Sequence, residues 1–329
     1  MSVLPKIRQY FWGQYADLLY IWLRMHRSFE VTVLGTSSAS PTKTRFPSSQ
    51  LVRLEGDYFL IDCGEGTQHQ LVRLGLRMQR IRYILITHLH GDHVYGLPGL
   101  ISSMALFGRS EKLTIVGPEA LKDLLDLIIR TTESRVTFEI EYIKTNPQKA
   151  ETVLANRKWS LSTVPLKHRI ACTGFILREQ GPELRLNAPV CEQMGVPVEY
   201  YESLKWGDDW QKEDGSIVPN KLLTLPGNPN RSYAYISDTI YDESIVPHIQ
   251  GCNLLYHEAT FLHDLLERAT ETHHTTSKQA GQIATKAGVG RLMIGHFSSR
   301  YHQTDDLLLE AQEQFADSIL AHEGITVAI

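Results

Sequence analysis

Three histidines and one aspartate fall within six consecutive residues of this 329-residue chain. They are His88, His90, Asp92 and His93, and the apolar segment 83–86 before them is typical of a buried strand. Imidazole nitrogens and carboxylate oxygens are good ligands for Zn²⁺, with Mn²⁺ or Fe²⁺ as alternatives. Four donors so close in sequence cannot easily close around one tetrahedral ion. The cluster therefore predicts two adjacent metal ions.

Three more candidate ligands follow other apolar segments of the chain. They are His168, Asp238 and His296, which come after residues 162–167, 233–237 and 292–295. Strand ends at one edge of a sheet are where α/β folds place their chemistry. With the cluster, these residues bring the number of donors to seven. Seven donors are enough for two ions that share one carboxylate and leave a position for water.

The elements that must position these donors follow an α/β pattern. From Phe29 onward, short runs rich in Val, Ile and Tyr alternate with stretches of helical spacing. Strands are predicted at 29–34, 58–62, 83–87, 113–116, 136–143, 159–165, 173–178, 232–237, 253–257 and 292–295, and helices at 119–132, 276–287 and 305–318. Gly91 is expected to let the ligand loop turn tightly, and residues 96–99 to end it and begin a helix.

Composition and charge limit the class of protein. A chain with 42% hydrophobic and 21% charged residues is an ordinary globular protein. Its net charge of −4 provides no general attraction for nucleic acid, so an RNA substrate would need a local basic patch. The four cysteines are widely spaced and form no CxxC pair. A reducing, cytoplasmic compartment is therefore expected.

Two segments fall outside the regular pattern. Residues 1–28 form an N-terminal extension, partly aromatic but too polar to span a bilayer, for which we expect a packed or partner-facing helix. A translation start at Met25 is the alternative. Residues 29–329 read as one hydrolase domain. Within it, regularity is lost at about 180–229, which predicts an inserted, substrate-binding arm.

The HxHxDH segment resembles that of the metallo-β-lactamase superfamily, and the wider set of motifs is similar to the ribonuclease Z family of tRNA 3′-processing endonucleases. The segments that carry this resemblance are 33–36, 62–68, 87–100, 168–169, 237–239, 257–261, 274–276 and 296–300. The resemblance implies a metallo-β-lactamase-like αββα sandwich with an inserted arm. It also implies a cytoplasmic homodimer that acts on precursor tRNA and does not enter a membrane.

The resemblance assigns a role to each candidate site residue. His88, His90 and His168 would bind one zinc ion, Asp92, His93 and His296 a second, and Asp238 would bridge them. Asp62 would accept a hydrogen bond from a ligand histidine and so orient it. The nucleophile would be a water or hydroxide whose pKa falls from near 16 to about 7 on the metals.

Two residues would move protons. Asp92 would orient the nucleophile or accept its proton, and His274 would protonate the departing oxygen, leaving a 3′-hydroxyl on the tRNA. The Thr-Thr pair that follows selects His274 over the adjacent His273. Glu258 would hold His274 in its productive orientation.

The arm departs from the family pattern. The family's arm is usually basic and rich in Gly and Pro, whereas residues 178–225 contain five Lys or Arg against nine Asp or Glu. Its aromatic residues, Tyr200, Tyr201, Trp206 and Trp210, would either stack on nucleotides or pack the arm. The alternative function is therefore a phosphodiesterase of the same fold that acts on a smaller or non-tRNA substrate.

Two further classes are disfavoured by the ligand set. A metal-binding scaffold with a vestigial site would be expected to have lost at least one donor. A di-iron redox enzyme would be expected to carry a carboxylate in place of His90.

Overall fold

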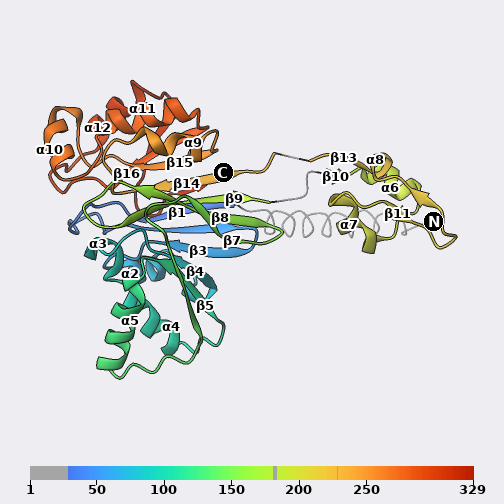
Figure 1. Ribbon diagram of the computed structural model, residues 1–329, viewed down its shortest axis with the longest axis horizontal. Coiled ribbons are helices and arrows are strands. Elements are labelled where there is room, and N and C mark those ends of the chain that lie inside the picture. The colour runs from blue at the N-terminus through green and yellow to red at the C-terminus, as the bar shows by residue number, and fades with distance from the viewer. Residues whose placement is uncertain (1–28, 181–183, 228) are drawn as a thin grey trace, which may run out of the picture.

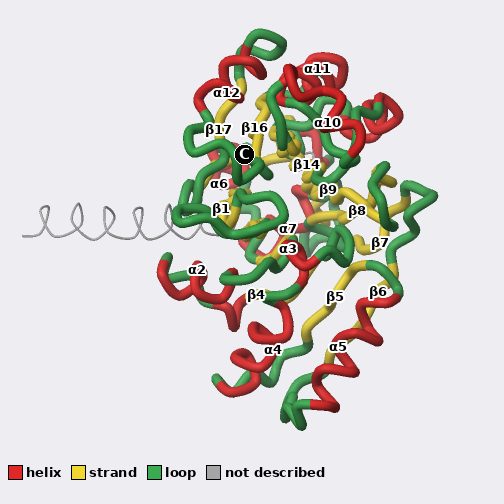
Figure 2. Tube along the Cα trace, turned by 90° about the vertical axis from the view of Figure 1, so that its left-hand side faces the viewer, coloured by secondary structure: helices red, strands yellow, loops and turns green. Residues whose placement is uncertain are grey.

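The computed structural model describes residues 29–180, 184–227 and 229–329 (Figure 1). The predicted N-terminal helix within residues 1–28 lies outside the described residues. Two seven-stranded sheets pack face to face, and helices cover the outer face of each. Figure 2 shows the two helical layers at opposite ends of the body with the strands between them. The predicted αββα sandwich is confirmed.

The first sheet combines an antiparallel half with a parallel half. Its order is β18 (Thr326–Ala328), β1 (Phe29–Gly35), β2 (Ser49–Leu54), β3 (Asp57–Ile61), β4 (Ile81–Leu85), β5 (Leu113–Gly117) and β6 (Ile140–Lys144). Strands β3 to β6 run parallel. The chain of this half also forms α2 (Thr67–Arg73), α3 (Gly91–Val94), α4 (Leu97–Leu106) and α5 (Ala120–Thr131).

The second sheet has the same mixed character. Its order is β17 (Ser318–Leu320), β16 (Arg291–Gly295), β15 (Leu254–Glu258), β14 (Ser232–Ile236), β9 (Cys172–Glu179), β8 (Trp159–Leu166) and β7 (Glu151–Ala155). Strands β14 to β17 run parallel. Its helices are α9 (Val246–Ile249), α10 (Leu266–Glu271), α11 (Ser277–Ala287) and α12 (Asp305–Gln312).

The main core lies between the sheets, where both contribute fully buried side chains. Phe59 of the first sheet meets Trp159 of the second edge to face, with ring centroids 4.9 Å apart. The indole N–H of Trp159 donates to Asp57 Oδ2 at 2.8 Å, so the largest buried side chain keeps its polar atom paired. Because helices cover the outer faces, most strands are apolar on both sides.

The sequence prediction was wrong at several boundaries. The strand predicted from residue 136 begins only at Ile140, and the helix predicted to residue 318 ends at Gln312. Beyond this end the N–H groups of Gln314 and Phe315 still donate to the Ala311 carbonyl. A turn therefore follows the helix and continues the helical spacing of apolar residues that the prediction was based on. Strands β2, β7, β17 and β18 were not predicted. Two of these have three residues each, too few for a period to be visible.

Residues 184–227 form an arm that stands away from the body in Figure 1. It contains β10 (Leu184–Leu186), α6 (Ala188–Gln193), α7 (Tyr201–Lys205), β11 (Trp210–Gln211), β12 (Ile217–Val218), α8 (Asn220–Leu223) and β13 (Thr224–Pro226). The arm has its own small core around Cys191, Leu204 and Trp210, against which Tyr200 and Tyr201 pack. Most of its aromatic residues therefore hold the arm together.

None of the helices within the described ranges combines the length and the apolar character that crossing a membrane requires.

Candidate metal centre

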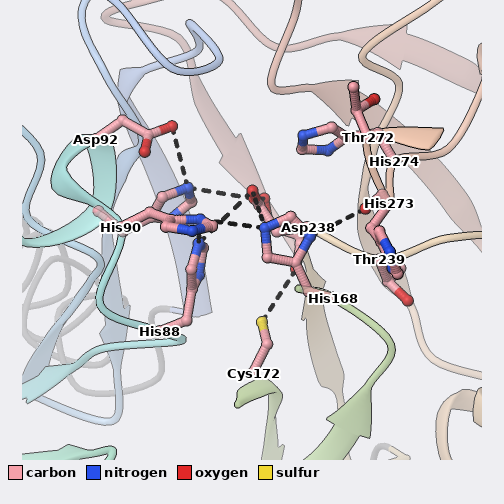
Figure 3. A network of polar contacts seen from close by, with 12 residues as sticks. His88, His90, Asp92, His168, Cys172, Asp238, Thr239, Thr272, His273 and His274 are labelled. Carbon is pink, nitrogen blue, oxygen red and sulfur yellow. Dashed lines mark hydrogen bonds and ion pairs between the residues drawn. The ribbon is translucent and has the colours of Figure 1, made fainter. Parts of the chain in front are cut away.

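All seven predicted donors meet at one edge of the sandwich, where strands of both sheets end. His88 and His90 lie in the loop after β4, and Asp92 and His93 in the short helix α3. His168 follows β8, Asp238 follows β14 and His296 follows β16. Figure 3 shows His88, His90, Asp92 and His168 arranged around Asp238. Residues from four other places in the chain thus surround the carboxylate of Asp238.

The first group of donors consists of His88, His90 and His168 with one oxygen of Asp238. His90 Nδ1 lies 3.0 Å from His88 Nε2 and 3.1 Å from His168 Nε2. Asp238 Oδ2 lies 3.7 and 3.8 Å from the same two Nε2 atoms. Ligands about 2.0–2.1 Å from a tetrahedral zinc stand about 3.3 Å apart. The four atoms therefore have the spacing of ligands around one ion.

The second group consists of Asp92, His93 and His296, and Asp238 also forms a group with His274 and His296. Asp238 Oδ1 lies 3.2 Å from His93 Nε2 and 3.3 Å from His296 Nε2. Asp92 Oδ2 is 3.5 Å from both of these nitrogens. Each oxygen of Asp238 thus faces a different group. This is the arrangement of a carboxylate that bridges two ions.

Unpaired nitrogens provide an independent test of whether a metal fits. Nε2 of His93 and Nε2 of His296 are buried and have no hydrogen-bond partner within the described part of the chain. Nδ1 of His168 must carry its proton because it donates to the His273 carbonyl at 3.0 Å, so its Nε2 presents a lone pair. A buried polar atom left unpaired costs about 1–3 kcal/mol. A metal ion would satisfy Nε2 of His93 and of His296, and Nε2 of His168 would be a further ligand.

The charge of the site also favours cations. Asp62, Asp92, Asp238 and Glu258 are all largely buried there. Burial lowers the pKa of His88, His90 and His168, so these imidazoles are neutral at pH 7, which is the form that binds metals. Burial also opposes protonation of His93, but the charges of Asp238, Asp62 and Asp92 outweigh it and raise its pKa. Such an excess of buried negative charge requires compensation.

Asp62 binds the side of His93 that faces away from the other donors of the second group. Its Oδ2 accepts a hydrogen bond from His93 Nδ1 at 2.7 Å and one from the Tyr235 hydroxyl at 3.0 Å. Its Oδ1 accepts from the backbone N–H of Thr87 at 2.9 Å. Because Nδ1 is bound to Asp62, His93 turns its Nε2 into the site, where it would become a metal ligand on losing its second proton.

Glu258 supports two histidines at once. Nδ1 of His274 lies 3.1 Å from both of its carboxylate oxygens. The hydroxyl of Thr260 donates to Glu258 Oε2 at 2.6 Å and lies 3.0 Å from Nδ1 of His296. Burial opposes protonation of His274, but the charge and hydrogen bonds of Glu258 outweigh it and raise the pKa of His274 to about 9. The adjacent His273 instead contributes its backbone carbonyl to His168.

The backbone bends sharply where these residues leave their strands. Asp62, Asp238 and His296 have φ values of 55°, 58° and 59°, in the left-handed region that residues other than glycine seldom occupy. Such conformations cost about 1–3 kcal/mol and persist where the surroundings fix them. Here the bends turn the side chains from the strand ends into the site.

Four supporting residues were not singled out in the sequence. Thr87 and Thr260 lie inside recognised motifs, so their position was a usable signal. Tyr235 looks like any other buried strand residue. Ala39 donates its backbone N–H to Asp92 Oδ2 at 2.8 Å. Because the side chain takes no part in this contact, the residue type gives no signal for it.

A cleft of about 430 Å³ opens over the centre. Its lining includes His90, Asp92, Asp238 and His274, with Tyr95 and Arg169 nearer the surface. The chain turns at Gly91 as expected, with the His93 N–H donating to the His90 carbonyl at 3.0 Å, but the φ of Gly91 is not in the left-handed region that requires glycine. A Cβ at Gly91 would lie 2.2 Å from the ring of Tyr95, so a side chain there would displace that ring.

An αββα sandwich with an HxHxDH loop and a shared aspartate at the strand ends defines a metallo-β-lactamase-fold protein. The structure of a metallo-β-lactamase-fold protein from Bacillus subtilis covers 92% of the chain with a TM-score of 0.64 at 20% identity, which supports the fold. A family model described as anti-Pycsar protein Apyc1 matches residues 29–181.

Longer matches identify the family. A protein named ribonuclease Z from Parabacteroides distasonis is 40% identical over 92% of the chain and 99% of its own length. A ribonuclease Z from Cytophaga hutchinsonii is 42% identical over 90% and 95%. The crystal structure of human tRNase Z, short form, matches with a TM-score of 0.66 and 26% identity, over 91% of this chain and 99% of that one.

The chain therefore belongs to the ribonuclease Z family. Membership makes it a nuclease, an enzyme that acts on phosphodiester bonds.

The hydrogen bond from His93 to Asp62 leads to a prediction about metal binding. Asp62→Asn keeps the size of the side chain but removes the charge that fixes His93, so the affinity for Zn²⁺ is expected to fall about 10- to 100-fold. Competition with a chromogenic chelator measures this affinity. Asp317→Asn on the surface is the control, and equal affinities in the two variants would contradict the role of Asp62.

Proposed function

We propose that the chain is a zinc-dependent endoribonuclease that removes the 3′ trailer from precursor tRNA and leaves a 3′-hydroxyl on the tRNA. Membership of the ribonuclease Z family supports the substrate class. The observation that carries the chemistry is the position of His274 beside the seven donors, with its Nδ1 bound by a buried carboxylate. A proton donor beside the candidate metal centre would support hydrolysis of a phosphodiester.

The seven donors would hold two divalent ions, which would activate water and neutralise charge on the phosphodiester. Zinc is the ion that a set of His and Asp ligands fits best, with Mn²⁺ or Fe²⁺ as alternatives.

Asp92 is the candidate proton acceptor. Burial disfavours its charge, but His93 and His296 outweigh this effect and lower the pKa of Asp92, so it is a carboxylate at pH 7. The backbone N–H of Ala39 fixes Oδ2. Asp92 lines the cleft, where it can orient the attacking water and accept its proton.

His274 is the candidate proton donor. Its raised pKa keeps it protonated at pH 7, and Glu258 holds Nδ1. Nε2 therefore carries the proton that faces the cleft. Protonating the departing O3′ as its bond to phosphorus breaks would leave the 3′-hydroxyl on the tRNA and the phosphate on the 5′ end of the trailer.

The acidic arm supports a second candidate function, hydrolysis of a smaller phosphodiester by the same centre. Its excess of Asp and Glu is unfavourable for contacts with RNA phosphates. Since most of its aromatic side chains pack within the arm, they do not compensate by stacking on bases.

We also propose a cytoplasmic homodimer. The four cysteines are buried and free, which fits a reducing compartment. Helices α2 and α4 are joined by a hydrogen bond from Gln68 to Ser103, and one turn further along each face lie the exposed side chains of Val72 and Phe107. Exposed apolar residues on adjoining helices favour association between copies.

The first prediction tests the substrate. Purified protein is expected to cleave a 3′-extended precursor tRNA at the trailer junction, and a chelator is expected to abolish this activity. A simple phosphodiester is assayed in parallel with the same metals. Cleavage of the simple ester alone would contradict the tRNA assignment and favour the smaller substrate.

The second prediction concerns His274. His274→Ala is expected to retain metal and lose turnover by about 10²- to 10⁴-fold, the usual contribution of a general acid, whereas His273→Ala keeps its backbone carbonyl and most of the rate. Because the protonated form is active, the wild-type rate is expected to fall as the pH rises through about 9. Glu258→Gln removes the charge that raises this pKa, so the fall moves to lower pH. A wild-type rate in His274→Ala would exclude its role.

The third prediction concerns the homodimer. Multi-angle light scattering is expected to give the mass of two chains for the wild type and of one chain for Phe107→Glu, because the new charge would be buried at the interface. Lys286→Glu is the control on another face. A monomeric wild-type protein would contradict the proposal.

A further inference from the structure

Tyr95 is a large aromatic side chain that the fold leaves in solvent beside the candidate metal centre. Of the aromatic side chains that the structure describes, only Tyr95, Phe107 and Trp206 are exposed, at 71%, 70% and 38%. Phe107 lies at the far end of α4 and Trp206 in the arm. Among the three, Tyr95 alone lines the cleft over Asp92 and His274.

The backbone at Tyr95 is fixed by hydrogen bonds and close packing. Its backbone N–H bonds to the Gly91 carbonyl at 3.0 Å, and its ring lies directly against Gly91, where a Cβ would be 2.2 Å from the ring. The next residue, Gly96, donates to the Cys63 carbonyl at 2.9 Å and touches Gly64 so closely that a Cβ would lie 2.2 Å from its oxygen. The backbone on both sides of Tyr95 is therefore fixed, and its ring lies against Gly91 while much of it faces solvent.

The surroundings suit a nucleotide. Arg169 and Tyr95 line the same cleft, so a cation for a phosphate and an aromatic face for a base are available together. Asp92, only three residues before Tyr95, lines it as well. A base next to the reacting phosphate is thus within reach of the ring.

We propose that Tyr95 is a specificity-determining residue whose ring stacks on a nucleobase that flanks the scissile phosphate. The proposal rests on the proposed endoribonuclease function and adds a contact that a phosphodiester without a base cannot make. Stacking accepts any base, so Tyr95 would distinguish nucleotide from non-nucleotide substrates without reading a sequence.

The test pairs Tyr95 variants with precursor tRNAs that carry an abasic nucleotide. Tyr95→Ala is expected to lower kcat/KM on the intact precursor about 10- to 100-fold, the range that stacking of one base provides, whereas Tyr95→Phe keeps the wild-type value. An abasic residue is placed either just before or just after the cleavage site. At one of these two positions the abasic residue is expected to lower the kcat/KM of the wild type by the same factor. On that substrate Tyr95→Ala is expected to have no additional effect on kcat/KM.

Three controls separate this proposal from others. Leu309→Ala, which removes an exposed apolar side chain of α12 away from the cleft, is expected to keep the wild-type kcat/KM. Tyr95→Ala is expected to keep the metal content and the rate on a simple phosphodiester. Loss of the metal or of this rate in Tyr95→Ala would show a structural role and overturn the proposal. The proposal would also be overturned if Tyr95→Ala lowered kcat/KM further on both abasic precursors. Absence of precursor tRNA cleavage by the wild type would instead contradict the proposed function.

Discussion

The carboxylate of Asp238 is the point on which the two halves of the site depend. One oxygen faces His88 and His168, and the other faces His93 and His296. His88 and His93 follow a strand of the first sheet, and His168 and His296 follow strands of the second. The carboxylate therefore reaches both groups only if the sheets keep their spacing and β14 ends where it does. The left-handed backbone at Asp238 is part of this requirement.

A buried cluster of carboxylates and histidines must also hold each ring in one orientation. Asp62 does so for His93, and Glu258 does so for His274 and, through Thr260, for His296. Both carboxylates are themselves bound by backbone N–H groups, from Thr87 and from Thr239. The metal-facing atoms are thus positioned by the ends of several strands, which explains why a site made of loops can be rigid.

The sequence was sufficient for the fold class and for gathering the candidate donors, because strand ends with metal-binding side chains are local patterns. It could not reveal contacts made by the backbone, such as the N–H of Ala39 on Asp92, or the long-range bond from Tyr235 to Asp62. Gly91 was interpreted only as a turn residue because its packing partner, the ring of Tyr95, is visible only in three dimensions. That the seven donors bind metal stays a prediction.

The arm leaves and rejoins the body at the ends of two neighbouring strands. β9 ends at Glu179, β14 begins at Ser232, and the two pair antiparallel, with Arg178 opposite Ser232. In the second sheet, the arm therefore has the same place as the loop that connects the two strands of a β-hairpin. Because the arm also has its own core, changes to its length or sequence need not disturb the strand ends that hold the site. The arm and the candidate metal centre can therefore vary independently of each other.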